Sequence, residues 1–435
     1  MIKFLNLFFP LWDFLYILQL EEYELKRYWW QVQRRLFKRG FQKRATLKYT
    51  GRIKVTIALL VTMLTAVILE LLQMQMYVYT AVVVATLPLT IPYLIGFVSK
   101  LIGQVVTLQK NRQLRAATTY FKRNYPNTKV IAITGSFGKT TTKYMLQHVL
   151  QYDHNVAIIP NNINTGIGVA HHILANKVPT KTEWLIVEMG AYRQGDIAQT
   201  ATVVVPDLAI LTILGDQHLC RFGSHANLVA GKSEIFTTNK QTTCYVTTSS
   251  LGLIKEQRIA TNQLVAVEVF KNQKSTAYLV KQLALDLGVS EESIDTSIAN
   301  FAPPDRRNNI IERQGVTIID NSYNISPMVA EAMLQEAAET AQTQSKKLVV
   351  MTGGIGEQGV AGPAANKQLG KLISKYAKRA ILHPSIYIKA AESSLTVPFV
   401  YIPMGLDVSE KPADWLDGRT EILLWLTDHG DEAYL

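Results

Sequence analysis

Two adjacent apolar segments constrain the fold of this chain more than any other feature. Residues 55–72 contain a single charged side chain, Glu70, near their end, and residues 76–98 contain none. A helix of about 20 apolar residues crosses a hydrocarbon layer about 30 Å thick, so each segment is long enough to span a membrane. Pro88 and Pro92 are expected to kink the second helix without excluding it. The sequence therefore predicts a transmembrane helical hairpin within residues 55–100.

Basic residues on both sides of this hairpin predict its orientation. Eleven Lys and Arg residues lie between positions 26 and 54, six lie between 100 and 123, and the turn between the two segments has none. Positively charged flanks stay in the cytoplasm, so we expect a multi-pass protein of the cytoplasmic membrane with its later domains on the cytoplasmic side. A buried helical hairpin in a soluble protein is the alternative.

The first 54 residues are expected to form a basic, amphipathic segment ahead of the hairpin. Residues 1–20 are apolar and aromatic but are interrupted by Lys3, Pro10 and Asp13. This pattern fits a helix at the membrane interface better than a third span. Whether residues 1–20 insert into the membrane or lie on it stays open.

The distribution of charge separates the chain into two parts. Residues 1–129 carry 19 Lys and Arg against 5 Asp and Glu, a net charge of +14, while the whole chain carries +11, so the remaining residues carry −3. A nucleic-acid-binding protein is expected to carry its positive charge on the folded domain, so this pattern favours membrane lipid as a partner and argues against nucleic acid. The two cysteines, Cys220 and Cys244, are too few for a disulfide framework and lack a metal-binding spacing.

From about residue 124, short apolar runs alternate with helical stretches. The predicted strands are KVIAIT, EWLIVEM, LAILTIL, TIIDNS and KLVVMTGG. This alternation is typical of a doubly wound α/β fold, in which ligands bind at the carboxyl ends of the strands. We expect a central domain over residues 101–303 and a C-terminal domain over residues 304–435.

A glycine-rich turn follows the first predicted strand, where residues 135–141 read GSFGKTT. Such a turn directs backbone N–H groups and a helix N-terminus at an anion. Lys139 is predicted to reach the β- and γ-phosphates, and the Thr140 hydroxyl to hold Mg²⁺. Ile133 stands where the full Walker pattern has glycine, so the turn is a shortened variant. The predicted residues that bind ATP or GTP are Gly135, Ser136, Gly138, Lys139, Thr140 and Thr141.

Three further residues follow predicted strands and come after this turn in the chain. Glu188 ends one strand and suits a hard cation bound to phosphates. His218 comes just after another strand, and Lys232 lies on the helix expected next. Each of these residues alone fits an ordinary structural role, and their order after the phosphate turn is what favours a functional one.

Five motifs in order resemble the ATP-dependent Mur ligase family, closest to the branch that adds D-alanyl-D-alanine. They are ITGSFGKTTTK, NINTGIGVA, VEMGAYRQGDI, GDQHLCRFGSHANLVAGKSEIF and APPDRRNNIIERQGVTIIDNSYNISP. The resemblance extends over about residues 125–435. The resemblance implies a P-loop central domain and a Rossmann-like C-terminal domain. Upstream, where soluble members have a domain that grips the UDP-sugar, this chain has the membrane hairpin, so a lipid-linked or surface-held acceptor is expected.

The resemblance also implies a chemistry. ATP phosphorylates a carboxylate, and an amine then displaces phosphate to form an amide, with catalysis by positioning and charge neutralisation. The partners would be a carboxylated acceptor and an amino acid or dipeptide amine, and the cofactors ATP and Mg²⁺. The implied catalytic residues are Lys139, Lys232 and His218. The implied metal ligands are Thr140, Glu188, His218 and Lys232, the last as a carbamylated lysine. Arg306 would reach ATP, and the implied substrate residues are Asn162, Asn164, Thr165, Ser322 and Asn324.

Departures from the family pattern keep other functions open. Arg193 stands where the branch has histidine, Thr165 where it has a second asparagine, and Asn321 where it has aspartate. A catalytically inactive, membrane-anchored ATP-binding scaffold is therefore one alternative. A ligase that adds amino acids to a poly-acidic polymer is another. An unrelated P-loop ATPase or GTPase tied to transport is the third, although the chain has no N-K-x-D stretch to read guanine.

Overall fold

The structure is a computed structural model. It describes residues 11–21, 23–35, 47–160, 163–215, 217–237, 239, 241–257, 259, 263–268, 275–304, 309–322, 325–356, 358, 361–385, 387–402 and 412–426. The chain divides into two compact units, residues 1–112 with 432–435, and residues 113–431.

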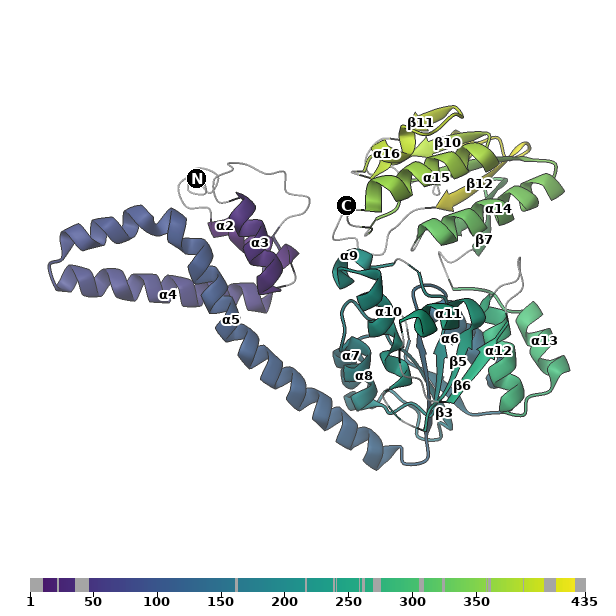
Figure 1. Cartoon of the computed structure of the whole chain (residues 1–435), viewed down its shortest axis with the longest axis horizontal. Helices are drawn as coiled ribbons and strands as arrows, with labels where there is room; N and C mark the ends of the chain where they lie inside the picture. Colours follow the sequence, from purple (N-terminus) through teal and green to yellow (C-terminus); the bar gives the residue numbers. More distant parts are fainter. Residues whose placement is uncertain are drawn as a thin grey trace. The chain divides into compact units, whose positions relative to one another are not determined.

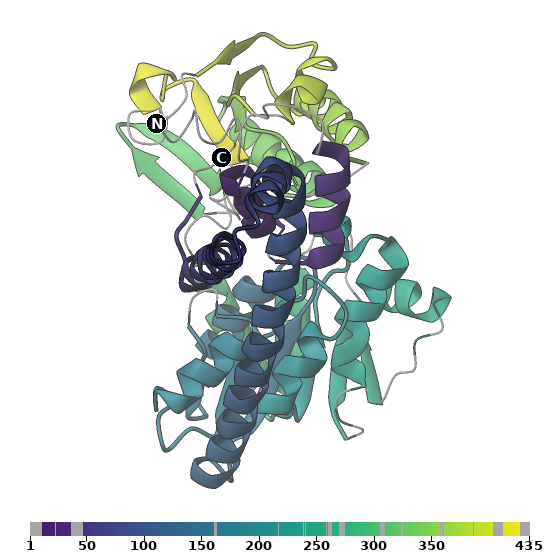
Figure 2. The same cartoon turned by 90° about the vertical axis from the view of Figure 1, so that its left-hand side faces the viewer.

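The first unit is helical. It contains α2 (Leu11–Leu20), α3 (Leu25–Arg35), α4 (Gly51–Gln73) and the first part of α5 (Tyr77–Asn124) (Figures 1 and 2). Five consecutive residues of α2, Phe14 to Leu18, are buried, and Gln19 exchanges two hydrogen bonds with the backbone of Lys48. A helix lying at a membrane interface buries one face only. Helix α2 therefore differs from the expected interfacial helix, because it is enclosed by protein; residues 1–10 lie outside the described part.

Helices α4 and α5 are both long and apolar enough to cross a membrane. Their most apolar windows have mean hydropathies of 2.5 and 2.1, and only 11% and 28% of those windows are buried. A core helix of a soluble protein would instead be mostly covered by its neighbours. Helix α5 includes Pro88 and Pro92 and continues to Asn124, so it is one helix across the expected boundary at residue 100.

The second unit begins with a six-stranded parallel sheet. Its strands are β1 (Lys129–Thr134), β2 (Val156–Ile158), β3 (Trp184–Glu188), β4 (Leu208–Leu211), β5 (Thr243–Thr247) and β6 (Gln263–Val267), in the order β2-β3-β1-β4-β5-β6. Strand β1 pairs with β3 on one side and with β4 on the other. The chain leaves β1 toward β2 and later crosses to β4, which makes this region the switch point where α/β proteins bind ligands.

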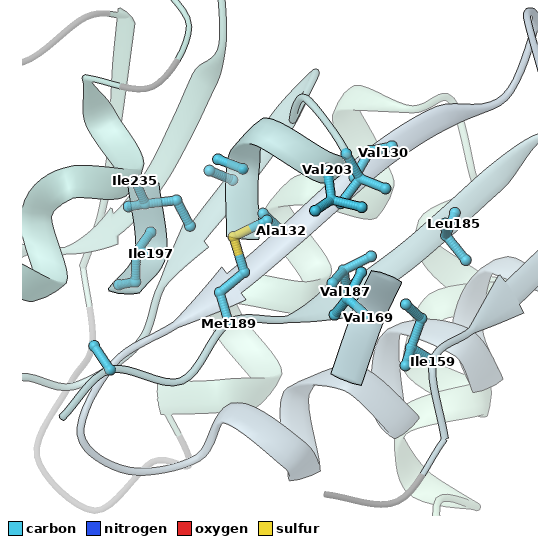
Figure 3. Packing of buried hydrophobic residues seen from close by; sticks show 14 of the residues in the cluster. Val130, Ala132, Ile159, Val169, Leu185, Val187, Met189, Ile197, Val203 and Ile235 are labelled. Carbon is cyan, nitrogen blue, oxygen red and sulfur yellow. The ribbon is translucent and has the colours of Figure 1, made fainter. Parts of the chain in front are cut away.

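Helices cover both faces of this sheet. One face packs against α6 (Lys139–Leu150), α12 (Ser275–Asp286) and α13 (Glu291–Ala299). The other packs against the last turns of α5, and against α7 (Gly166–Leu174), α8 (Asp196–Val203), α9 (Leu219–Phe222), α10 (His225–Ser233) and α11 (Thr248–Glu256). Figure 3 shows Val130 and Ala132 of β1 beside Val203 of α8 in this second layer. The short 3₁₀ helix η1 (Glu234–Phe236) follows α10.

A second sheet follows in the same unit. Its strands are β7 (Asn309–Arg313), β8 (Val316–Asn321), β9 (Lys347–Thr352), β10 (Arg379–Leu382), β11 (Phe399–Tyr401) and β12 (Glu421–Leu426), in the order β11-β10-β9-β12-β8-β7. All pairs are parallel except β7 with β8, an antiparallel edge that was not predicted. Helices α14 (Pro327–Thr343), α15 (Gly362–Tyr376) and α16 (Ile388–Glu392) pack on one face. The α/β fold predicted from the sequence is confirmed, and the expected boundary at 303/304 lies between α13 and β7.

Candidate functional site

The glycine turn after β1 has a backbone that only glycine adopts easily. Gly135 has φ +142° and Gly138, which caps α6, has φ +81°. A Cβ atom at Gly135 would lie 1.9 Å from the Thr212 hydroxyl at the end of β4. Backbone and neighbours therefore both require glycine at position 135.

The side chain of Ser136 fastens the turn to the segment after β4. Its hydroxyl donates to Gly215 O at 2.7 Å and accepts from Gly215 N at 2.9 Å, and its own N–H donates to Ile213 O at 2.8 Å. The Ser136 hydroxyl and N–H are therefore both bonded within the protein, and the role of Ser136 in binding a nucleotide stays a prediction. The first intrahelical bond of α6 runs from Thr142 N to Gly138 O, so the N–H groups of residues 139–141 belong to the helix N-terminus that attracts anions.

Two of the predicted lysines meet at one carbonyl group of this turn. The Lys139 ammonium donates to Gly135 O and Ser136 O, each at 3.1 Å. The Lys232 ammonium, which reaches over from α10, donates to Gly135 O at 2.9 Å and is only 1% exposed. Lys232 is 97 positions from Gly135 in the sequence, so the fold brings a distant ammonium to the carbonyl oxygen that Lys139 also contacts. The result is a concentration of positive charge at the carboxyl end of β1.

The hydroxyl of Thr140 and the carboxylate of Glu188 also come together. Thr140 Oγ1 donates to Glu188 Oε2 at 2.7 Å, and both side chains are buried. Lys143, one helical turn after Lys139, lies 3.6 Å from the same carboxylate oxygen. Parallel pairing of β1 with β3 sets Glu188 opposite Ile133, next to the start of the turn.

Hard oxygen ligands of this kind fit a divalent cation. Mg²⁺ is usually held by one or two protein oxygens, with phosphate and water supplying the rest. Thr140 and Glu188 offer such a pair. Among the described residues no group of three or more His, Cys, Asp or Glu side chains is arranged to hold a metal, so a cation here would depend on ligand oxygens as well.

The predicted substrate residues near β3 have clear structural contacts. Asn164 O accepts from Gly190 N at 2.8 Å, and the Asn164 side chain lies against the Cα of Gly190 so closely that a Cβ there would meet it at 2.9 Å. Thr165 caps α7, its hydroxyl accepting from Gly168 N at 3.3 Å. Asn164 therefore lies beside β3, which ends in Glu188, whereas the Thr165 side chain caps α7. Asn162 lies outside the described residues.

His218 lies against an aromatic residue that the sequence did not single out. Its ring centroid is 4.7 Å from that of Tyr192, edge to face, and the Arg221 guanidinium lies 4.5 Å from the same Tyr192 ring. His218 has φ +63° at the start of α9. Tyr192 comes four residues after Glu188, so His218 is beside the loop that begins at the carboxylate.

On the second sheet, Ser322 follows the last residue of β8. Its N–H donates to Asp320 Oδ1 at 3.0 Å, and the side chain is fully buried. Within the described part of the chain, neither the Ser322 hydroxyl nor the Asn321 side-chain amino group finds a hydrogen-bond partner. Unsatisfied polar groups at a strand end suit a ligand that would complete them. Arg306 and Asn324 lie outside the described residues.

Comparison with known proteins places this geometry in context. Residues 133–322 match the Mur ligase middle domain. The UDP-N-acetylmuramoyl-tripeptide–D-alanyl-D-alanine ligase of Bacillus subtilis is 25% identical over 280 residues, which cover 57% of this chain and 60% of the relative. The same ligase of Escherichia coli is 25% identical and covers 56% of this chain and 61% of the relative. The chain thus spans about three fifths of the length of these curated relatives.

Solved structures agree on the fold. MurF from Acinetobacter baumannii superposes with a TM-score of 0.63 at 22% identity, over 74% of this chain and 78% of that one. MurF ligase from Thermotoga maritima, solved in complex with ADP, has the same TM-score and identity and is covered over 81%. The predicted resemblance to Mur ligases, and to their branch that adds D-alanyl-D-alanine, is confirmed.

Two residues at this site were missed from the sequence alone. Lys143 lies inside the motif ITGSFGKTTTK, four positions after Lys139, and that helical spacing was the available signal. Tyr192 carried no signal, because its neighbours come from a loop that only the folded chain brings near.

Proposed function

We propose that this chain is a membrane-anchored, ATP-dependent ligase that joins a carboxylate to an amine and releases ADP and phosphate. The observation that carries the proposal is the meeting of Lys139 and Lys232 at Gly135, beside the Thr140–Glu188 pair, at the switch point of the sheet. The match of this region to the Mur ligase middle domain supports the same function.

Each residue of the site has a role in this proposal. The ammonium of Lys139 moves from the turn carbonyls to the β- and γ-phosphates of ATP, while the N–H groups at the start of α6 bind the same phosphates. Thr140 and Glu188 hold Mg²⁺, which supplies charge neutralisation on the phosphates when bound. His218 and Lys232 would complete the cation sites, Lys232 once its neutral amine has added CO₂ and lost a proton to become an anionic carbamate, and Arg306 would contact ATP. Gly135 and Gly138 shape the turn, and Thr141, in the first turn of α6, stays a proposed nucleotide-binding residue.

The reaction balances in two steps. An acceptor carboxylate oxygen attacks the γ-phosphorus of ATP, the bond to the β-phosphate oxygen breaks, and ADP leaves. The amine nitrogen then attacks the acyl carbon, phosphate leaves, and a proton is lost as the amide forms. Lys139 stabilises the charge that develops on the transferred group, because fixed cations need no reorganisation during the reaction.

The relatives suggest the class of substrate. Those named above are ligases of UDP-N-acetylmuramoyl tripeptide and D-alanyl-D-alanine. A folylpolyglutamate synthase/dihydrofolate synthase of Yersinia pestis with the same fold, at a TM-score of 0.53 and 13% identity, was solved with AMPPNP and Mn. We infer ATP with Mg²⁺ as cofactors, a peptidoglycan-type precursor as acceptor, and an amino acid or dipeptide as amine. We propose that Asn162 and Asn164 bind the acceptor and that Ser322 and Asn324 bind the amine.

Membrane attachment favours an acceptor held at the membrane. The apolar windows of α4 and α5 are largely exposed, and basic residues flank both helices. Exposed apolar helices of this length are stable in lipid and not in water. We therefore propose a cytoplasmic-membrane protein with two spans, whose acceptor is a lipid-linked precursor.

Release of ADP tests the proposed function. Full-length protein in lipid nanodiscs is given ATP and Mg²⁺ with UDP-N-acetylmuramoyl tripeptide, its lipid-linked form or polyglutamate, and with D-alanyl-D-alanine or single amino acids. We expect ADP only when an acceptor and an amine are both present, and at least a hundredfold loss with Lys139→Ala because the phosphates lose their ammonium. ADP release that ignores the acceptor would indicate an unrelated ATPase. ATP binding without turnover on every acceptor would favour the inactive scaffold.

A further inference from the structure

Lys143 is a buried lysine next to the proposed catalytic groups, and it has no role in the function described so far. Its side chain is 0% exposed, although a lysine is almost never fully buried without paired charge. Removing an ammonium group from water is energetically costly, and only good partners offset that cost. The contacts of Lys143 therefore indicate what it does.

Two of the groups that contact Lys143 lie at the ends of different strands. The Lys143 ammonium donates to Ile159 O at 3.0 Å and lies 3.6 Å from Glu188 Oε2. Ile159 directly follows β2, and its own N–H donates to Ile186 O in the middle of β3 at 3.1 Å. A single ammonium thus joins α6 to the end of β3 and to the exit of β2. The exit of β2 leads after four residues to Asn164, the segment proposed to face the acceptor.

The carboxylate of Glu188 is held from one side. Thr140 Oγ1 and Lys143 Nζ both approach its Oε2 oxygen, at 2.7 Å and 3.6 Å, and among the described residues no hydrogen bond or ion pair to Oε1 is formed. A carboxylate fixed through one oxygen presents the other in a defined direction. Groups that orient a metal ligand in this way typically contribute 10- to 100-fold to metal affinity.

We propose that Lys143 is a positioning residue for the divalent cation. It fixes the Glu188 carboxylate through Oε2 so that Oε1 faces the nucleotide phosphates, and it anchors the Ile159 carbonyl at the start of the acceptor-side segment. This inference rests on the proposed function, in which Glu188 binds the cation. Its charge also opposes that of a cation, so positioning and repulsion predict opposite effects when the lysine is removed.

Binding of Mn²⁺ distinguishes these two effects. Full-length protein in nanodiscs is titrated with Mn²⁺ in the presence of a non-hydrolysable ATP analogue, and free Mn²⁺ is followed by electron paramagnetic resonance. We expect Lys143→Met, which keeps the length of the side chain, to weaken Mn²⁺ binding about 10- to 100-fold because Glu188 loses its orientation. Unchanged or tighter binding would overturn the inference.

Two further variants keep the test interpretable. Lys143→Gln can still donate to Ile159 O, so it serves if Lys143→Met does not fold, and we expect at least a tenfold weakening. Lys281→Met removes a half-buried lysine of α12 that pairs with Asp295 at 2.7 Å and Glu291 at 2.8 Å, and it should leave Mn²⁺ binding unchanged. If Lys143→Gln binds Mn²⁺ as tightly as the wild type, the proposed role of Lys143 is overturned, whereas the proposed function is not affected.

A double variant tests whether Lys143 acts through Glu188. In a Glu188→Gln background, Lys143→Met should weaken Mn²⁺ binding by less than threefold further, since the oriented carboxylate is already gone. An equal effect in both backgrounds would contradict positioning. If the wild-type chain binds no Mn²⁺ with the nucleotide analogue, the proposed function itself fails, and this outcome is separate from failure of the Lys143 inference.

Discussion

The candidate site depends on single atoms at the glycine turn. The carbonyl oxygen of Gly135 accepts hydrogen bonds from both Lys139 and Lys232. The space that a Cβ atom at Gly135 would need is occupied by Thr212 Oγ1. A methyl group at this position has no room, and the φ of +142° is unfavourable for any other residue. The turn is therefore a rigid element whose shape brings the two ammonium groups together.

Gly135→Ala should consequently disrupt nucleotide binding. The new Cβ would displace Thr212 and shift the Gly135 carbonyl, so we expect ATP affinity to fall at least tenfold, as measured by calorimetric titration. Gly252→Ala is a matched control, because that glycine lies in α11 and has nothing within 4 Å of a Cβ. The control should bind ATP like the wild type. Equal affinity in Gly135→Ala would contradict the account of the turn.

At the residue scale, the sequence predicted which residues carry the chemistry better than it predicted which atoms they contact. Lys139 and Thr140 follow from local spacing, because a strand, a glycine turn and a helix determine where they point. The meeting of Lys232 with Gly135 depends on α10 packing against the sheet, and only the motif order of a known family indicated it. Lys143 was not predicted, since its two partners come from β3 and the exit of β2 and have no local pattern.

Among the elements, strands buried on both faces were the most predictable. The runs that form β1, β3, β4, β8 and β9 are rich in buried apolar residues, as strands covered on both faces require. Strand β2 has only three residues, and β7 is an antiparallel edge strand with mostly exposed residues, so neither has such a pattern. Helix α2 was expected at a membrane interface because apolar composition alone cannot distinguish lipid from a protein neighbour.

Strands β10 and β12 of the second sheet are joined by an ion pair across β9. Arg379 donates to both carboxylate oxygens of Glu421, each at 2.9 Å, and these bonds hold the pKa of Glu421 below its ordinary value. A carboxyl whose pKa is lowered by folding stabilises the folded state above its ordinary pKa, about 4.3. That stabilisation is lost as the pH falls through the lowered folded-state pKa.

Glu421→Gln should therefore destabilise β12 at neutral pH and have little effect in acid. We expect the free energy of opening of β12 at pH 7 to fall by about 1 kcal/mol, and the difference from wild type to shrink once the pH is below the folded pKa of Glu421. Hydrogen exchange, corrected for the intrinsic rate at each pH, measures this quantity. Glu312→Gln, on the exposed strand β7, is the control. A difference that persists unchanged in acid would argue against the ion pair.

At the scale of the whole molecule, the chain combines two chemically different parts. The net charge of +14 belongs to residues 1–129, which include the exposed apolar helices, whereas the rest of the chain carries −3. This separation was readable from composition, and it agrees with the proposal of a membrane-held part and a nearly neutral enzymatic part. The identity of the acceptor was not readable, because a sequence motif alone does not reveal which neighbours surround the residues proposed to bind it, Asn162 and Asn164.

The central claim is that the site at the end of β1 activates a carboxylate by transferring the γ-phosphoryl group of ATP to it. The most direct test uses an acceptor, UDP-N-acetylmuramoyl tripeptide or its lipid-linked form, whose carboxylate oxygens are isotopically heavy. Full-length protein is supplied with this acceptor, ATP, Mg²⁺ and D-alanyl-D-alanine, and the released phosphate is analysed by mass spectrometry. We expect each released phosphate to carry one heavy oxygen from the acceptor. Turnover that yields only unlabelled phosphate would contradict it.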